Sequence, residues 1–340
     1  MSVRVTPETE PSTAPTTDTA PQEEKAADAS PEEEVTLDAP EPPEDVVLDA
    51  PDPRTILQMR LRTVLLNLPA IFKFENVISG VEATDLFALN SVLGASIEGQ
   101  VVKALNQQRP LWDPDDQWLG YTFERQSQAF PDVRLVRRHD DGLDIVLGIE
   151  LKGWFLLSKE GKPSFRFQQT PAACADHDLL VVVPWYLDNV LSGSPVAAEP
   201  FVESARWAAE FRNYYWQHTR GAKAGTDRRI IAPPDAQPYP TKVDLILDKA
   251  VNDSGDNFGR VARSPGLMKD FIERSNAFEV LGIRVQDWCQ FLRVHSDQGD
   301  RDAISARITA AAEKLVAKRS EAAADRVVKA LKELLVALEE

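Results

Sequence analysis

The chain has 340 residues and a formal net charge of −16, a balance that ordinarily argues against a nucleic-acid partner. The charge is uneven, because residues 1–53 hold 15 Asp and Glu but only Arg4 and Lys25, a net −13 that leaves −3 for the other 287 residues. The body is therefore near neutral, and nucleic-acid binding stays open. The length allows two domains, or one domain with extensions.

Residues 1–53 are predicted to be a disordered acidic tail. They are rich in Pro, Glu, Thr and Ala and lack aromatic residues or an apolar period, so they cannot bury enough surface to offset ordering entropy. Two interpretations remain open. The tail is a solvated leader, or it is an acidic mimic that competes with DNA for a basic cleft.

No apolar signal region follows Met1, and no run of 18 apolar residues occurs, so we expect neither secretion nor a membrane span. Cys174 and Cys289 lack metal-binding spacing, and the four histidines make no zinc signature. Two buried thiols suit a reducing compartment, and the expected location is the cytoplasm.

Residues 54–110 are predicted to be a helical N-terminal segment leading into the core. One helix begins at Pro53 and ends before Pro69, and a segment at 83–90 leads into a second helix at 92–108. Glu98 lies at the edge of the apolar stripe of that second helix. It either faces the site described next or points to solvent.

Residues 111–235 are predicted to form the core, with a first strand at 121–128 and a hairpin at 130–154. Apolar residues alternate along both hairpin strands, and the turn at 139–142 offers Gly142 for a positive φ. Alternation places Glu150 and Lys152 together on the opposite face of the second strand. Antiparallel pairing brings Asp132 to the same level.

Two carboxylates and an amine at one end of a hairpin suit metal-assisted hydrolysis. Asp132 and Glu150 supply oxygen ligands for Mg²⁺, with Mn²⁺ as a substitute, because Mg²⁺ keeps several waters and accepts one or two carboxylates. The ion lowers the pKa of a bound water, and Lys152 orients the nucleophile or stabilises the transition state.

At these residues the chain resembles the PD-(D/E)XK nuclease superfamily, which includes many type II restriction endonucleases. Pro131-Asp132 matches the PD element and Glu150-Leu151-Lys152 the (D/E)XK element, within a region of roughly 92–217. The resemblance implies an α/β fold: a mixed central sheet flanked by helices, a restriction-endonuclease-like core, with helical N- and C-terminal additions. It implies Asp132 and Glu150 as metal ligands, Lys152 as the catalytic lysine and Glu98 as an additional catalytic acid.

Beyond the hairpin, a returning strand is predicted at 164–169, a short helix from Thr170 to about Asp178, and a buried central strand at 179–184. Arg166 and Gln168 share one face of the returning strand. They contact phosphate, or they are ordinary residues of a half-exposed strand.

A helix is predicted at 201–218, and its aromatic stripe fits core packing better than base stacking. The Gly-bearing loop that follows carries Lys223, Arg228 and Arg229. These three bases contact DNA phosphates, or the loop is merely solvated.

Residues 236–299 are predicted to be an accessory α/β region, with a strand at 243–247 and helices at 265–274 and 285–294. Residues 300–340 read as a C-terminal helix or helical hairpin, suited to packing on the body or to dimerisation.

The function predicted from these features is that of a hydrolase, a Mg²⁺-dependent endonuclease (deoxyribonuclease) acting on double-stranded DNA. The resemblance favours a type II site-specific enzyme of a restriction-modification system. It would act as a homodimer and be accompanied by a cognate DNA methyltransferase. The alternatives are another anti-phage defence or repair nuclease of the superfamily, or a non-catalytic DNA-binding or assembly protein that retains the fold.

Overall fold

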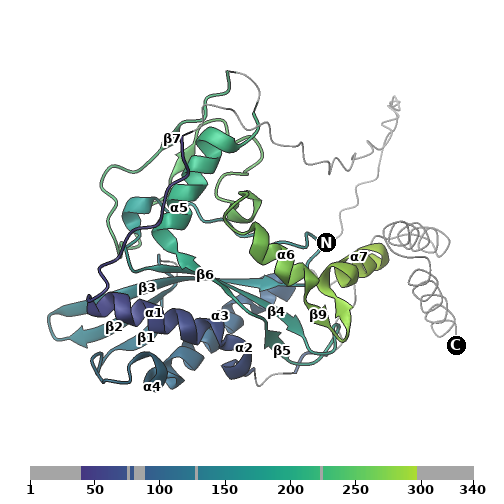
Figure 1. Cartoon of the computed structure of the whole chain (residues 1–340), viewed down its shortest axis with the longest axis horizontal. Coiled ribbons are helices and arrows are strands. Elements are labelled where there is room, and N and C mark those ends of the chain that lie inside the picture. Colours follow the sequence, from purple (N-terminus) through teal and green to yellow (C-terminus); the bar gives the residue numbers. More distant parts are fainter. Residues whose placement is uncertain (1–39, 75–76, 80–88, 127–128, 223–224, 297–340) are drawn as a thin grey trace, which may run out of the picture. The chain divides into compact units, whose positions relative to one another are not determined.

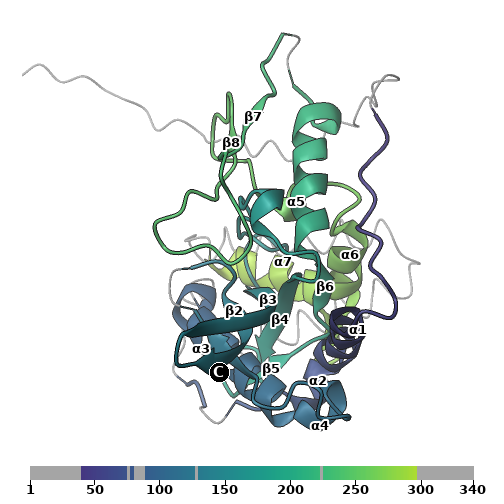
Figure 2. The same cartoon turned by 90° about the vertical axis from the view of Figure 1, so that its left-hand side faces the viewer.

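A computed structural model describes residues 40–74, 77–79, 89–126, 129–222 and 225–296, all within one compact unit. A six-stranded mixed sheet with helices on both faces forms its centre (Figures 1 and 2), so the predicted α/β class is confirmed. The tail up to residue 39, most of the segment 83–90, Lys223 and the C-terminal region 300–340 lie outside the described residues.

The sheet has the strand order β1-β2-β3-β4-β5, and β6 also pairs with β4. Only β3 and β4 are parallel; their neighbours pair antiparallel. The strands are β1 (Thr122–Arg125), β2 (Val133–His139), β3 (Gly142–Phe155), β4 (Leu179–Leu187), β5 (Pro195–Ala197) and β6 (Phe201–Ser204). The first seven residues of β4 are buried, as expected for a strand that is covered on both faces.

Helices cover the sheet on its two faces. On one face lie α1 (Pro53–Leu66), α2 (Leu68–Ile71), α3 (Leu89–Gln107) and α4 (Arg109–Trp112). On the other lie α5 (Ala205–Tyr214), which continues as a π-helical turn (Tyr215–Thr219), and α6 (Lys269–Ala277). The remaining elements are α7 (Val285–Ser296) and two short ribbons, β7 (Ile230–Ile231) with β8 (Lys249–Ala250) and β9 (Glu279–Val280) with β10 (Ile283–Arg284).

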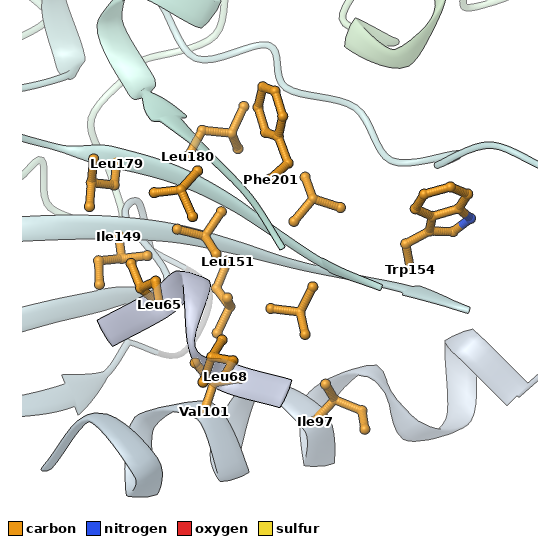
Figure 3. Close-up of a cluster of buried hydrophobic side chains, with 14 of the residues drawn as sticks. Leu65, Leu68, Ile97, Val101, Ile149, Leu151, Trp154, Leu179, Leu180 and Phe201 are labelled. Atoms are coloured by element: carbon orange, nitrogen blue, oxygen red, sulfur yellow. The ribbon is translucent and has the colours of Figure 1, made fainter. Parts of the chain in front are cut away.

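The main core lies between β3 and the helices of the first face. Ile149 and Leu151 of β3 are 1% exposed and share one face of the strand. Figure 3 shows them near apolar side chains of the helices: Leu65, Leu68, Ile97 and Val101. Leu180 and Phe201 lie on the opposite side of the sheet. The alternate residues of β3 therefore face the second layer, and Glu150 and Lys152 are among them.

The β2–β3 hairpin fixes the level of Asp132. His139 pairs with Gly142, so Asp140 and Asp141 form a two-residue turn. Gly142 does not have a positive φ, and the expectation that it would is wrong. The register shifts once, between residues 135 and 136, and before that bulge Val133 pairs with Ile149. Asp132, the residue before β2, therefore lies opposite Glu150.

Four predicted elements differ from the structure. The expected strand at 164–169 makes only one isolated bridge, from Gln169 to Leu247, and the expected strand at 243–247 is an exposed loop. The helix at 170–178 is a single 3₁₀ turn (Pro171–Ala173), and the helix at 201–218 begins as β6. Alternation indicates a strand only where one face is buried, and Val243 and Leu245 are 86% and 81% exposed.

A close approach to Gly148 of β3 generates the first prediction. A Cβ atom at this position would lie 2.4 Å from Pro131 Cγ and 2.9 Å from Asp178 Oδ1, a carboxylate oxygen that accepts the Gly148 N–H at 2.7 Å. Gly148→Ala should lower the free energy of unfolding by ~1–3 kcal/mol, because Pro131 and Asp178 must both move.

The measurement is urea denaturation, with Gly142→Ala as the matched control, since an added Cβ there meets nothing within 4 Å. Equal stability of the two variants would show that the contact with Pro131 does not constrain the chain.

Candidate active site

Three ionisable groups converge at the start of the β2–β3 hairpin. Lys152 Nζ lies 2.8 Å from Asp132 Oδ2 and 2.7 Å from Glu150 Oε1. The main chain reinforces this arrangement, because Asp132 Oδ2 accepts the Leu151 N–H at 3.0 Å and Glu150 Oε2 accepts the Asp132 N–H at 3.3 Å. The structure thus brings together the three residues that the alternation and the hairpin register predicted.

Burial controls the charges of this cluster. The Glu150 side chain is only 3% exposed, and burial raises its pKa to about 7; the Lys152 ammonium opposes the rise and the Asp132 charge adds to it. Burial alone would lower the pKa of Lys152, but Glu150 and Asp132 together raise it above its ordinary value. Lys152 is therefore a cation at neutral pH, whereas Glu150 exchanges its proton near neutrality.

The cluster lies at one wall of a cleft of about 710 Å³. Asp132, Glu150 and Lys152 line it together with Phe130, and two stretches of the segment 230–249, which we call the strap, line it as well. The strap adds the bases Lys242 and Lys249, the acid Asp244 and the apolar side chains Ile231, Pro233, Pro234, Leu245, Ile246 and Leu247. The cluster wall thus carries two carboxylates and one ammonium, and the strap wall carries two lysines and one carboxylate, charges that suit a ligand with both a metal ion and phosphates.

The strap is held to the body at two places. Near residue 240, Arg134 Nη2 donates to the Pro240 carbonyl at 3.1 Å and the Tyr239 hydroxyl donates to Asp178 at 3.0 Å. Farther along, the Thr170 N–H donates to the Ile246 carbonyl at 2.7 Å. This wall of the cleft is therefore joined to the body by these hydrogen bonds and not by a strand of the central sheet.

A buried ion pair holds the same end of the strap. Arg212 of α5 and Asp248 are 2% and 1% exposed, and their side chains meet at 2.6 Å. Arg212 also donates to the carbonyls of Phe167 and Gln169, at 2.7 and 3.0 Å. This arginine thus ties the strap to the segment that enters the cleft beside Glu150.

Gln169 is the residue that the sequence analysis missed. Its Nε2 lies 3.5 Å from Glu150 Oε1, and its buried Oε1 has no hydrogen-bond partner in the described part of the chain. Strand alternation predicts that Gln168 faces the site, but the side chain of Gln168 packs beside Gly259 instead. Because the segment is extended without regular pairing, no periodic signal identified the correct residue.

Glu98 of α3 lies close to the cluster without lining the cleft. It pairs with Arg125 at 2.8 Å. Burial raises its pKa, the Asp132 charge adds to the rise, and Arg125 and Lys152 oppose it. Glu98 therefore interacts electrostatically with the cluster. It neither lines the cleft nor points freely into solvent, so neither predicted position describes it fully.

The structure does not bring the predicted DNA-binding residues to the cleft. Arg166 pairs with Asp256 at 3.2 Å, Arg229 pairs with Asp227 at 2.7 Å, and Arg228 donates to main-chain carbonyls at 3.5 Å. None of the three lines the cleft. Lys242 and Lys249 line the cleft instead. They flank the segment 243–247, for which the prediction of a strand is wrong.

The two carboxylates match the donor set of a hard cation. No three His, Cys, Asp or Glu side chains gather as a metal cluster within the described ranges. A Mg²⁺ site does not need three, since this ion commonly keeps several waters and takes one or two protein carboxylates. The fit has one condition. A cation shared by Asp132 and Glu150 would compete with the Lys152 ammonium for the same oxygens.

Comparison with protein-family models, with curated proteins and with solved structures finds no match for this chain. None of the helices in the described part combines the length and the apolar character that a bilayer crossing requires.

The raised pKa of Glu150 predicts how stability depends on pH. A carboxyl group whose pKa rises from 4.5 to about 7 on folding binds its proton more tightly in the folded state, so the free energy of unfolding falls as pH rises across this range. The shift in pKa corresponds to a decrease in the free energy of unfolding on the order of 3 kcal/mol.

Urea unfolding in EDTA should therefore show that the stability of the parent, relative to Glu150→Gln, decreases from pH 5 to pH 8. A constant difference, or one that grows with pH, would mean that the ion pair with Lys152 outweighs the burial of Glu150.

Proposed function

We propose that this chain is a Mg²⁺-dependent endonuclease that hydrolyses phosphodiester bonds in DNA. The observation that carries the proposal is the cluster of Asp132, Glu150 and Lys152 in a cleft whose other wall presents Lys242 and Lys249. Two carboxylates without a basic wall would suit many metal sites. The added lysines favour an anionic substrate that enters along the strap.

The chain's own residues have separate roles in this proposal. Asp132 and Glu150 would hold Mg²⁺, which when bound lowers the pKa of a water and neutralises developing phosphate charge. The Lys152 ammonium, released from the carboxylates, stabilises negative charge on the phosphate or orients the attacking water. Lys242 and Lys249 attract the neighbouring phosphates, and Gln169 fixes the orientation of the Glu150 carboxylate.

Within this class, we propose a type II restriction endonuclease as the first choice. Cutting both strands of a duplex requires two sites, and a homodimer supplies them across a palindromic sequence by symmetry. A cognate DNA methyltransferase would then protect the host DNA. Anti-phage and repair nucleases of the same superfamily use the same residues and differ in the substrate that reaches the cleft.

A second candidate function follows from the ion pairs themselves. Because Lys152 bridges both carboxylates, the cluster also resembles a structural ion-pair network that neutralises buried charge. The corresponding protein binds DNA or another partner without cutting it. The two candidates differ in whether Mg²⁺ changes what the protein does.

Incubation with plasmid DNA tests the proposal. We expect the parent to cut the plasmid in Mg²⁺ and not in EDTA. We also expect Asp132→Asn and Lys152→Met each to lower the cleavage rate by at least about 100-fold, because each removes a group that acts on the transition state.

Asp141→Asn is the matched control, an exposed acid in the turn at the far end of the same hairpin. DNA binding without cutting by the parent, in any divalent cation, would favour the second candidate. Discrete bands, rather than a smear, would identify a site-specific enzyme.

A further inference from the structure

A second concave site lies beside the C-terminal end of α5, where the π-helical turn meets the loop at 257–264. It has a volume of about 60 Å³. Its lining contains four arginines, one serine (Ser264) and no acidic residue. Drug-sized or nucleoside-sized ligands usually occupy about 300–1,000 Å³, so this pocket has room for one small group rather than a whole nucleoside.

Three of the four arginines are available to a ligand. Arg212 is buried and neutralised by Asp248. Arg220 stacks over the Trp216 ring at 3.9 Å, and Arg260 donates only to the Asp256 carbonyl at 3.3 Å. Neither pairs with a carboxylate of the described residues.

Arg263 completes the set. It donates to Asn257 Oδ1 at 2.6 Å, and its contact with the Glu160 carboxylate is long at 3.9 Å. Converging guanidinium groups repel one another unless an anion lies between them. Their planar donors match the oxygens of a phosphate, and stacking on Trp216 holds one guanidinium in place.

The pocket and the cleft share one segment of chain. The Phe167 N–H donates to the carbonyl of Gly259, which lines the pocket, at 2.7 Å. Two residues later, Gln169 lines the cleft beside Glu150. Arg212 lines the pocket and hydrogen-bonds Gln169 at the same time. A polymer that carries several phosphates is the kind of anion whose chemistry suits both sites.

We propose that Arg220, Arg260 and Arg263 bind a backbone phosphate of the DNA whose scissile bond lies in the cleft. This inference rests on the proposed function for its ligand, since the arginines by themselves select only a phosphate-like anion. The contact is independent of base sequence, so it contributes affinity and register rather than specificity.

The test is the salt dependence of DNA binding. Duplex DNA is titrated in EDTA between about 50 and 200 mM salt, where removing one phosphate-binding interaction should reduce the slope of log K against log salt by about 0.9. The Arg220→Gln, Arg260→Gln double variant should lower the slope by about 1 and the affinity by about tenfold at the lower salt concentration.

Two further variants distinguish loss of a phosphate contact from a general effect of substitution on folding. Arg138→Gln is the matched control, because Arg138 of β2 is exposed, pairs with Glu124 of β1 and lies outside the pocket. The single variant Arg220→Lys keeps the charge but removes the planar guanidinium, so it should retain most of the parent's salt slope. Thermal unfolding confirms that all variants fold like the parent.

The source of the phosphate is decided by a second titration with inorganic phosphate alone. An unchanged salt slope in the double variant overturns the proposal, even when the parent binds inorganic phosphate, because the site would then serve free anions.

Cleavage by the same samples in Mg²⁺ separates this inference from the proposed function. A parent that never cuts, together with a double variant whose slope is reduced, supports the phosphate contact and rejects the hydrolysis. A parent that cuts while the slope does not change rejects the contact alone.

Discussion

Burial of the Glu150 carboxylate beside the Lys152 ammonium is the constraint on which the site depends. A buried carboxylate without a partner is strongly unfavourable, and in this sheet the compensating charge comes from two positions along the same strand. Ion pairs of this kind seldom stabilise a fold more than apolar side chains of similar volume would. A requirement of function explains the three ionisable groups better than a requirement of stability.

The fold makes this arrangement rigid. β3 is buried on both faces near its C-terminal half, with apolar residues toward α1 and α3 and the ionisable residues toward the strap. Asp132 reaches the cluster from the other hairpin strand, and its position is fixed by the register and by the close contact between Pro131 and Gly148. Arg212 then links the strap, Gln169 and the arginine pocket through hydrogen bonds. The candidate catalytic groups therefore lie on a preorganised frame.

Local patterns predicted the hairpin but not the opposite wall of the cleft. Alternation over 143–151 and the short turn fixed the pairing, and the level of Asp132 followed from the pairing alone. Residues 243, 245 and 247 of the strap show the same alternation, yet they are exposed and belong to no strand. The strap is held instead by single hydrogen bonds that involve Arg134 and Tyr239. These bonds join residues that are 106 and 61 positions apart, and such contacts leave no periodic trace in the sequence. For the same reason, alternation predicts Gln168 at the site, whereas Gln169 lies there.

The most direct test of the central claim is a crystal structure of the protein soaked with Mn²⁺, whose anomalous scattering locates the ion. The proposal predicts a peak bound by oxygens of both Asp132 and Glu150, at roughly 2.0–2.6 Å as for hard cations, with the Lys152 ammonium moved off the carboxylates. A map in which Lys152 still bridges Asp132 and Glu150, with no anomalous peak between them at saturating Mn²⁺, would contradict it.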